Sequence, residues 1–161
     1  MFLNLNKLLL VIVLMLVSHG AYSETCKHYA NRMQYKLDLV VPDTGFSIAI
    51  CRILGHDKTL IDEALIIASI ESDFYNAISK GANDFGYFQF HKNTLKRLNI
   101  PPTVFMRDVN LQVVMYVWLM TEKKIMCRNF AVPQACWHSA TRKHYLRYAK
   151  LYKLLERRLN E

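Results

Sequence analysis

The stretch that decides the fold is Thr59–Ile70, TLIDEALIIASI, whose apolar side chains point in nearly every direction around a helix. Such a helix lies inside a core, because a surface helix keeps one polar face toward water. Asp62 and Glu63, near its beginning, are its only charged residues. Thr59 is typical of an N-cap, with Asp62 three residues later. The sequence therefore predicts a buried helix that begins at Thr59.

The remaining segments favour a mainly α single domain. We expect further helices over 46–54, 92–98, 109–126 and 145–159, and the apolar residues of 109–126 have helical spacing. Pro133 is typical of the start of a short helix, which we expect to run through Ala140. Gly81–Gly86, GANDFG, is rich in turn-forming residues, so we expect a small loop or β-like excursion from there to Phe90.

The N-terminal residues have the pattern of a secretory signal peptide. Lys7 precedes an unbroken apolar run, Leu8–Val17, and the small residues Ala21 and Ser23 then fit the recognition pattern of a signal peptidase. An uncleaved membrane anchor is the alternative, but the run is short against the ~20 apolar residues that a spanning helix needs. We expect cleavage after Ser23, which leaves 1–23 as the signal peptide, 24–161 as the domain, and a periplasmic or secreted protein.

Four cysteines lie in the expected mature chain: Cys26, Cys51, Cys127 and Cys136. An even number of cysteines in an exported protein indicates disulfides. Of the three pairings that four cysteines allow, we favour Cys26–Cys51 with Cys127–Cys136, because each pair is close in sequence. The cysteine and histidine spacings of a zinc site are missing from the sequence, so a zinc site is not favoured.

The formal charge of +8 at pH 7 favours anionic partners. Much of this charge lies in the last predicted helix, where a solvated helix face explains it equally well. Export argues against a cytosolic nucleic-acid role, and no helix-turn-helix or aromatic–basic motif supports one. We therefore expect no nucleic-acid partner, and contact with a membrane only through the signal peptide during export.

Glu71 directly follows the apolar run and continues one helical stripe, three residues after Ala68 and four after Ile67. A carboxyl group there is partly removed from water, which favours its uncharged form. An uncharged carboxylic acid is what a glycosidic oxygen needs as proton donor. Spacing alone fits a solvent-facing glutamate at a helix end equally well.

Three blocks of sequence, in order, resemble motifs of the soluble lytic transglycosylases, which share a core fold with goose-type lysozyme. Ile70-Glu71-Ser72-x-Phe74 resembles their Glu-Ser motif, and Gly86-Tyr87-Phe88-Gln89-Phe90 resembles their Gly-Leu-Met-Gln motif. Trp137-His138-Ser139-Ala140-Thr141 with Tyr148 resembles their Ala-Tyr-Asn-x-Gly block and its following tyrosine. Asp84-Phe85-Gly86 is similar to the Asp-Tyr-Gly form in the wall-cleaving proteins of bacterial secretion and conjugation machines.

The resemblance covers about Phe46 to Leu155 and implies a lysozyme-like fold, peptidoglycan glycan strands as substrate, and no metal or organic cofactor. Glu71 would protonate the bond between N-acetylmuramic acid and N-acetylglucosamine, then act as base on the muramoyl 6-hydroxyl to give a 1,6-anhydro product. The resemblance further implies substrate-binding roles for Ser72, Phe88, Gln89, His138 and Tyr148. By analogy with small relatives, the enzyme would serve a secretion, conjugation or pilus apparatus.

Two alternatives to a lytic transglycosylase stay open. Trp137-His138 stands where Tyr-Asn is usual, so a catalytically weak wall-binding protein is one alternative. A muramidase-type hydrolase is the other, and it normally needs a second carboxylate. Asp73, two residues from Glu71, would point elsewhere on the helix, and Asp84 is expected to stabilise its turn. With one convincing carboxylate, substrate-assisted transglycosylation is favoured.

Overall fold

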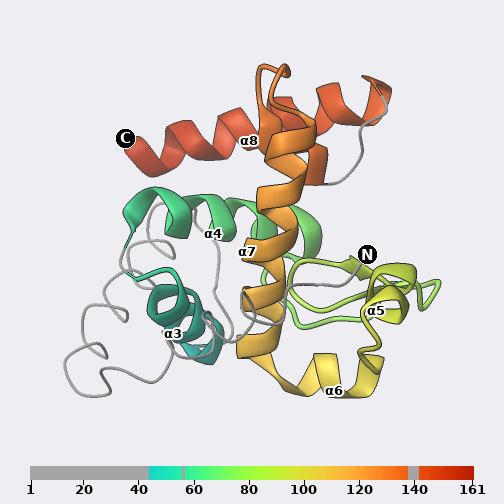
Figure 1. Ribbon diagram of the computed structural model, residues 1–161. Helices are drawn as coiled ribbons and strands as arrows, with labels where there is room; N and C mark the ends of the chain where they lie inside the picture. Colours follow the sequence, from blue (N-terminus) through green and yellow to red (C-terminus); the bar gives the residue numbers. More distant parts are fainter. Residues whose placement is uncertain (1–43, 56, 138–141) are drawn as a thin grey trace.

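Helix α4, Lys58–Ser72, is the buried helix that the sequence predicts, in a computed structural model that describes residues 44–55, 57–137 and 142–161 (Figure 1). Its side chains from Ile61 to Ser69 are buried except Asp62, which is partly buried. The prediction that Thr59 caps the helix is wrong. Asp57 is the N-cap, because its carboxylate accepts a hydrogen bond from the Leu60 backbone N–H at 3.1 Å.

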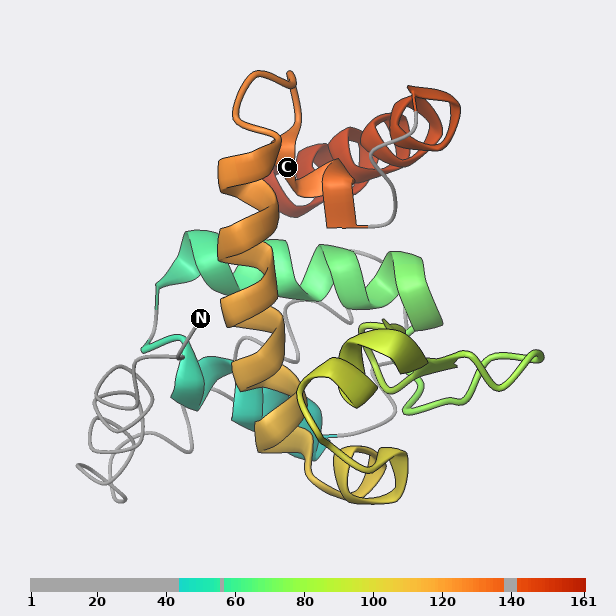
Figure 2. The same ribbon diagram turned by 45° about the vertical axis from the view of Figure 1, so that its right-hand side comes forward.

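Three long helices surround α4. Figures 1 and 2 show α7 (Val109–Met126) crossing α4, with α3 (Thr44–Ile53) on one side of α4 and α8 (Arg142–Asn160) on the other. The 3-10 helix η1 (Pro133–Trp137) connects α7 to α8 and packs on both. None of the described helices is both long and apolar enough to cross a lipid bilayer.

The smaller elements follow α4 in the chain. Strands β1 (Asp84–Phe85) and β2 (Phe90–His91) pair antiparallel, with Phe85 opposite Phe90, and form the predicted β-like excursion. Helix α5 (Lys92–Arg97) follows, and then α6 (Pro102–Arg107). The mainly α class is therefore confirmed.

Helix α6 is an element that the sequence analysis missed. Prolines interrupt helices when they lie in the middle, but Pro102 occupies the first turn of α6, where its missing N–H costs no hydrogen bond. The predicted helix over 109–126 has the observed bounds of α7. The expected helix from Pro133 is the 3-10 helix η1 as far as Trp137, and residues 138–141 lie outside the described residues.

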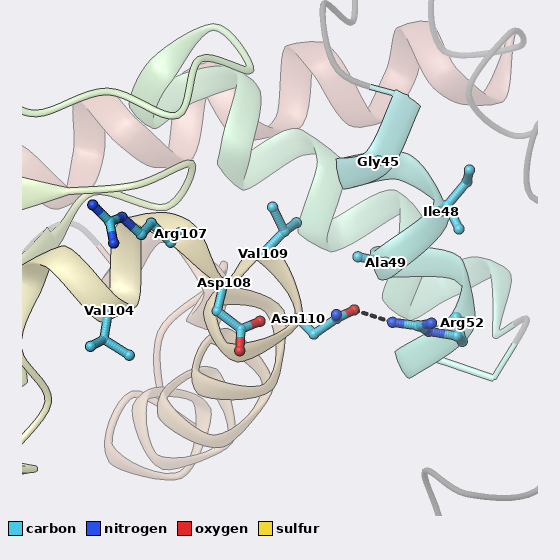
Figure 3. A pocket seen from close by; sticks show the side chains of 9 residues that line it. All are labelled: Gly45, Ile48, Ala49, Arg52, Val104, Arg107, Asp108, Val109 and Asn110. Carbon is cyan, nitrogen blue, oxygen red and sulfur yellow. Dashed lines mark hydrogen bonds between the residues drawn. The ribbon is translucent and has the colours of Figure 1, made fainter.

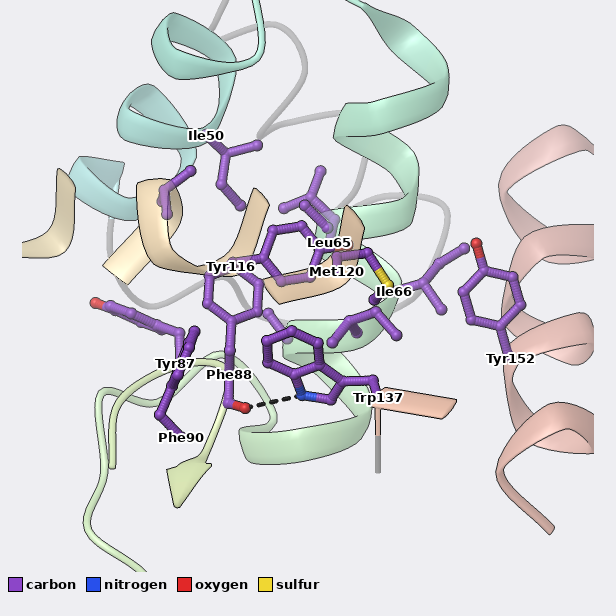
Figure 4. Packing of buried hydrophobic residues seen from close by; sticks show 14 of the residues in the cluster. Ile50, Leu65, Ile66, Tyr87, Phe88, Phe90, Tyr116, Met120, Trp137 and Tyr152 are labelled. Carbon is purple, nitrogen blue, oxygen red and sulfur yellow. Dashed lines mark hydrogen bonds between the residues drawn. The ribbon is translucent and has the colours of Figure 1, made fainter. Parts of the chain in front are cut away.

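Aromatic rings fill the space between α4, α7 and the loop that joins the two strands. Phe88 is fully buried and stacks on Tyr116 with ring centroids 4.2 Å apart, while Phe46 stacks on Tyr87 at 3.9 Å. Trp137 meets Phe90 edge-on at 5.2 Å. Figure 4 shows this cluster, in which the loop residues enter the core rather than cover it.

The buried side chain of Gln112 on α7 holds the same loop in place. Its Oε1 accepts a hydrogen bond from the Tyr87 backbone N–H at 3.0 Å, and its Nε2 donates to Asn76 Oδ1 and to the Phe105 carbonyl. Gly86 lies directly against it: a Cβ on Gly86 would come 2.3 Å from Gln112 Oε1. Gly86 also has a left-handed φ of 79°, so this position requires glycine for two reasons.

A disulfide joins Cys127 to Cys136, with Cα atoms 6.4 Å apart, and closes the loop between α7 and η1. The favoured pairing of these two cysteines is therefore confirmed. Cys51 is disulfide-bonded as well. Cys26 and the expected signal peptide lie outside the described residues.

Substituting Gly86 with alanine should destabilise the protein by about 3 kcal/mol, because the strain of a left-handed alanine adds to the displacement of a hydrogen-bonded, buried amide. Gly55→Ala is the matched control: Gly55 also has a left-handed φ, 62°, but nothing lies within 4 Å of its Cβ position. It should cost about 1 kcal/mol. Urea unfolding followed by circular dichroism measures both. Equal losses would show that contact with Gln112 is unimportant.

Candidate active site

A cleft of about 590 Å³ opens beside the C-terminal end of α4. Its walls come from α4, the small sheet, α5, the second half of α7 and η1. The lining residues are Glu71, Asp84, Gln89, Phe90, His91, Thr94, Arg97, Leu119, Glu122, Lys123, Met126 and Trp137. Aromatic, acidic, basic and amide groups thus face one hollow, and Glu71 is among them.

Glu71 lies on the last turn of α4 and is partly buried. Its neighbour is the buried phenol of Tyr148, which reaches it from α8. Burial raises the pKa of Tyr148 well above its ordinary value of 10.0, and the charge of Glu71 and a hydrogen bond between the two side chains raise this pKa further. The phenol therefore stays protonated, and its O–H donates a hydrogen bond to the Glu71 carboxylate. The structure thus brings together two of the residues that the resemblance singles out, Glu71 and Tyr148.

Ser72 and Gln89 use their hydrogen-bond donors inside the protein. The Ser72 hydroxyl donates to the carbonyl of Tyr87 at 2.7 Å and to that of Ala68 at 3.1 Å, and it thereby connects the end of α4 to the strand-joining loop. Gln89 Nε2 donates to the carbonyl of Gly86 at 2.7 Å and to that of Ala77 at 3.1 Å. Of the two, Gln89 lines the cleft. Both residues hold the loop in its observed conformation.

Gln89 also has a left-handed backbone, with φ of 49°. This conformation is strained for a residue with a side chain, and such strain gathers at functional sites. The two hydrogen bonds of the Gln89 amide offset that strain, because they join Gln89 to the carbonyls of Gly86 and Ala77 earlier in the chain. The feature therefore supports this loop as part of a functional site.

The expectation that Phe88 lines the cleft does not hold, since its ring is fully buried in the aromatic cluster. Its neighbours take that place: Phe90 and Trp137 both line the cleft. Trp137 Nε1 donates to the Phe88 carbonyl at 3.0 Å, which fixes the indole ring against the loop. Phe90 is buried as well, and its ring meets that of Phe88 edge-on with centroids 6.4 Å apart. His138 lies outside the described residues.

The two other carboxylates considered for the chemistry have different positions. Asp73 ends α4 in a left-handed conformation and is exposed, as expected of a helix-end residue. Asp84 lies in β1 and lines the same cleft as Glu71. The turn before it depends on Ser79, whose Oγ accepts hydrogen bonds from the backbone N–H groups of Asn83 and Asp84. Asp84 therefore lies both in the small sheet and at the wall of the cleft.

Glu63 is a buried carboxylate that the sequence analysis did not single out. Its Oε2 is 2.6 Å from Lys124 Nζ and accepts a hydrogen bond from Gln134 Nε2 at 3.1 Å, while its Oε1 accepts one from the Tyr116 hydroxyl. A buried charge is costly unless it has such partners. Because these partners belong to α7 and η1, the cluster holds η1 against α4, and with it the Trp137 side of the cleft.

A second hollow of about 680 Å³ lies between α3, α6 and the beginning of α7, and it shares no lining residue with the cleft (Figure 3). Its polar groups serve the fold: Arg52 donates to Asn110, and Asp108 caps α7 through the Leu111 N–H at 2.9 Å. Within residues 44–55, 57–137 and 142–161, no three His, Cys, Asp or Glu side chains gather as metal ligands.

Stability should fall as the pH rises above about 10. Burial raises the pKa values of Tyr116, Tyr148 and Tyr152 in the folded protein above the ordinary 10.0, so the unfolded chain releases these protons first and gains free energy on doing so. The contribution of these three buried phenols to the free energy of unfolding is complete below pH 10 and is lost as the pH rises above it. Phenolate absorbance of these tyrosines should appear only together with the loss of helical circular dichroism.

Tyr148→Phe is the control for this titration, because it should remove one phenol from the group that titrates on unfolding. The chain has nine tyrosines. If all nine titrated while the helical signal stayed intact, the three rings would not be buried as described.

Comparison with known proteins identifies no relative of this chain. No protein-family model, curated protein or solved structure matches the chain. The function must therefore be inferred from the residues of the cleft themselves.

Proposed function

We propose that this protein is a peptidoglycan lytic transglycosylase with a lysozyme-like fold, and that Glu71 is its catalytic acid and base. The observation that carries the proposal is the position of Glu71. Its carboxyl group is partly buried where the buried helix α4 ends, it lines the cleft, and it lies beside the protonated phenol of Tyr148. This environment suits a group that must exchange a proton with a bound sugar.

In the proposed reaction, Glu71 in its acid form gives its proton to the glycosidic oxygen of the N-acetylmuramic acid–β-1,4–N-acetylglucosamine bond. The bond to C1 breaks, and the acetamido group of the substrate stabilises the charge that develops there. The Glu71 carboxylate then accepts the proton of the muramoyl 6-hydroxyl as that oxygen attacks C1. The product ends in 1,6-anhydro-N-acetylmuramic acid, and Glu71 regains its proton.

The cleft walls support a glycan as the substrate. Phe90 and Trp137, both packed in the aromatic core, form an apolar part of the cleft wall. Gln89, Thr94 and Arg97 line the same hollow and can hydrogen-bond hydroxyl or acetamido groups. The disulfide between Cys127 and Cys136 agrees with an oxidising compartment such as the periplasm. We further propose that the enzyme remodels the cell wall locally for a secretion, conjugation or pilus apparatus.

Replacing Glu71 with glutamine should reduce the release of 1,6-anhydro-muropeptides from purified sacculi by about 10²–10⁴-fold, because the amide has a similar shape but cannot exchange the proton. Mass spectrometry of the soluble products measures the loss. Asp62→Asn is the matched control: Asp62 lies on the same helix, pairs with Lys58 and does not line the cleft.

The same experiment separates enzyme from accessory protein. If wild type sedimented with sacculi but released no muropeptides, the chain would be a wall-binding protein and the catalytic assignment would be wrong. If Glu71→Gln kept full activity, another group would have to be the acid.

A muramidase-type hydrolase is the second candidate, and the observation that favours it is Asp84 in the cleft with Glu71. Paired carboxylates at ~5–9.5 Å are the usual machinery of glycoside hydrolysis. A hydrolase would leave reducing-end N-acetylmuramic acid, because water replaces the 6-hydroxyl as nucleophile.

Product type should distinguish the two candidates. We expect 1,6-anhydro ends from wild type and from Asp84→Asn alike, because the nucleophile of the proposed reaction belongs to the substrate. Mass spectrometry of the muropeptides before and after borohydride reduction identifies the type of end, since only reducing ends react with borohydride. Reducing-end products from wild type that disappear in Asp84→Asn would instead assign the hydrolase.

A further inference from the structure

The outer face of α8 has an unusual composition. Between 146 and 158, every exposed side chain is either leucine or basic. The leucines are Leu146, Leu151 and Leu154, exposed by 56%, 40% and 44%. The basic residues are Arg147, Lys150, Lys153, Arg157 and Arg158. The opposite side of the helix holds Tyr145, Tyr148, Tyr152 and Leu155, all buried in the core.

Among the described residues, the helices that pack on α8 contact its inner side. In Figures 1 and 2, α8 lies at the edge of the molecule, and its contacts are with α4 and η1. The one acidic residue in the segment, Glu156, is partly buried at the flank and pairs with Lys153 at 2.6 Å. The outer face, defined here by its three leucines and five basic residues, therefore combines exposed apolar groups with one sign of charge.

This combination is unfavourable for a face that meets only water. Basic residues three and four positions apart repel each other along a helix, and glutamate at alternate positions would have relieved that repulsion. Each exposed leucine also keeps apolar surface in water. A partner that supplies negative charge and an apolar phase together would relieve both costs.

We propose that the outer face of α8 binds the surface of an anionic phospholipid bilayer. The arginines and lysines would meet the phosphate groups, and the leucines would enter the boundary between headgroups and acyl chains. The segment is about 20 Å long and straight, so it can lie flat on such a surface. The inference goes beyond the proposed function and beyond the expectation that the chain meets a membrane only during export.

Two other kinds of partner fit less well. A partner helix would need leucines at intervals of three and four that form one stripe, whereas Leu146, Leu151 and Leu154 are spaced by five and three. A polyanion such as nucleic acid or acidic wall polymer would pair with the basic groups but would leave the leucines in water. A fluid bilayer needs no register and offers both chemistries.

Flotation with lipid vesicles tests the proposal. The protein is purified after export and its N-terminus is determined by mass spectrometry, so that wild type and variants share the same N-terminus. Vesicles contain either phosphatidylcholine alone or phosphatidylcholine mixed with phosphatidylglycerol. We expect binding to the mixed vesicles only.

Two variants measure separately how much the basic residues and the leucines of the outer face contribute to vesicle binding. Arg157→Gln with Arg158→Gln should weaken binding about 25-fold, at about fivefold for each cation. Leu146→Gln with Leu151→Gln and Leu154→Gln should weaken it about tenfold or more, because the apolar insertion is lost. Glutamine keeps the helix propensity of both residue types, and circular dichroism checks the fold.

Control variants remove exposed apolar groups and cations elsewhere on the molecule. Ile78→Gln with Val104→Gln removes two other exposed apolar groups, of 54% and 51% exposure, and Lys80→Gln with Lys96→Gln removes two exposed cations. These variants should bind vesicles as wild type does, within about twofold for the apolar pair. Glu71→Gln should also bind fully, so that failure of this inference and failure of the proposed function are distinguishable.

Three outcomes would overturn the inference. Wild type that floats with neither kind of vesicle has no such surface. A triple leucine variant that binds like wild type would show that only general charge attraction acts. An Arg157/Arg158 variant no weaker than the Lys80/Lys96 control would show that the charge on α8 has no special part.

Discussion

A helix that is apolar in every direction is stable in water only if other elements cover all of its sides. This constraint on α4 determines most of the arrangement described above. Helices α3 and α8 lie on either side of α4, and α7 crosses it. The strand-joining loop and η1 complete the cover near the C-terminal end. Glu71 occupies the place where this cover ends and the cleft begins, so its position follows from the burial of the helix that carries it.

The sequence predicted those parts of the fold that depend on local pattern. Apolar spacing located α4 and α7, and turn-forming residues located the small sheet. Sequence proximity was enough for the disulfide between Cys127 and Cys136, because only nine positions separate them. The motif resemblance led to Glu71 and to the tyrosine, Tyr148, that lies beside it. These features are local, or they are carried by a recognisable motif.

Features that depend on contacts between distant segments were not predictable in this way. Phe88 and Phe90 are equally aromatic, and local pattern does not indicate that both rings enter the core or that only Phe90 also reaches the cleft, where it meets Trp137. Glu63 gave no signal, because its burial depends on Lys124 and Gln134, which are more than fifty positions away. Asp84 looked like a turn residue because its place in the cleft requires the pairing of β1 with β2.

The disulfide between Cys127 and Cys136 also has a consequence for maturation. Cys136 immediately precedes Trp137, so the bond fixes the start of the segment that completes the cleft. In a reducing compartment these two residues stay as thiols, and the indole loses the covalent restraint on its neighbour. Oxidation of this pair therefore fixes the segment that carries Trp137, and for the exported enzyme proposed above this step would complete the cleft only after export.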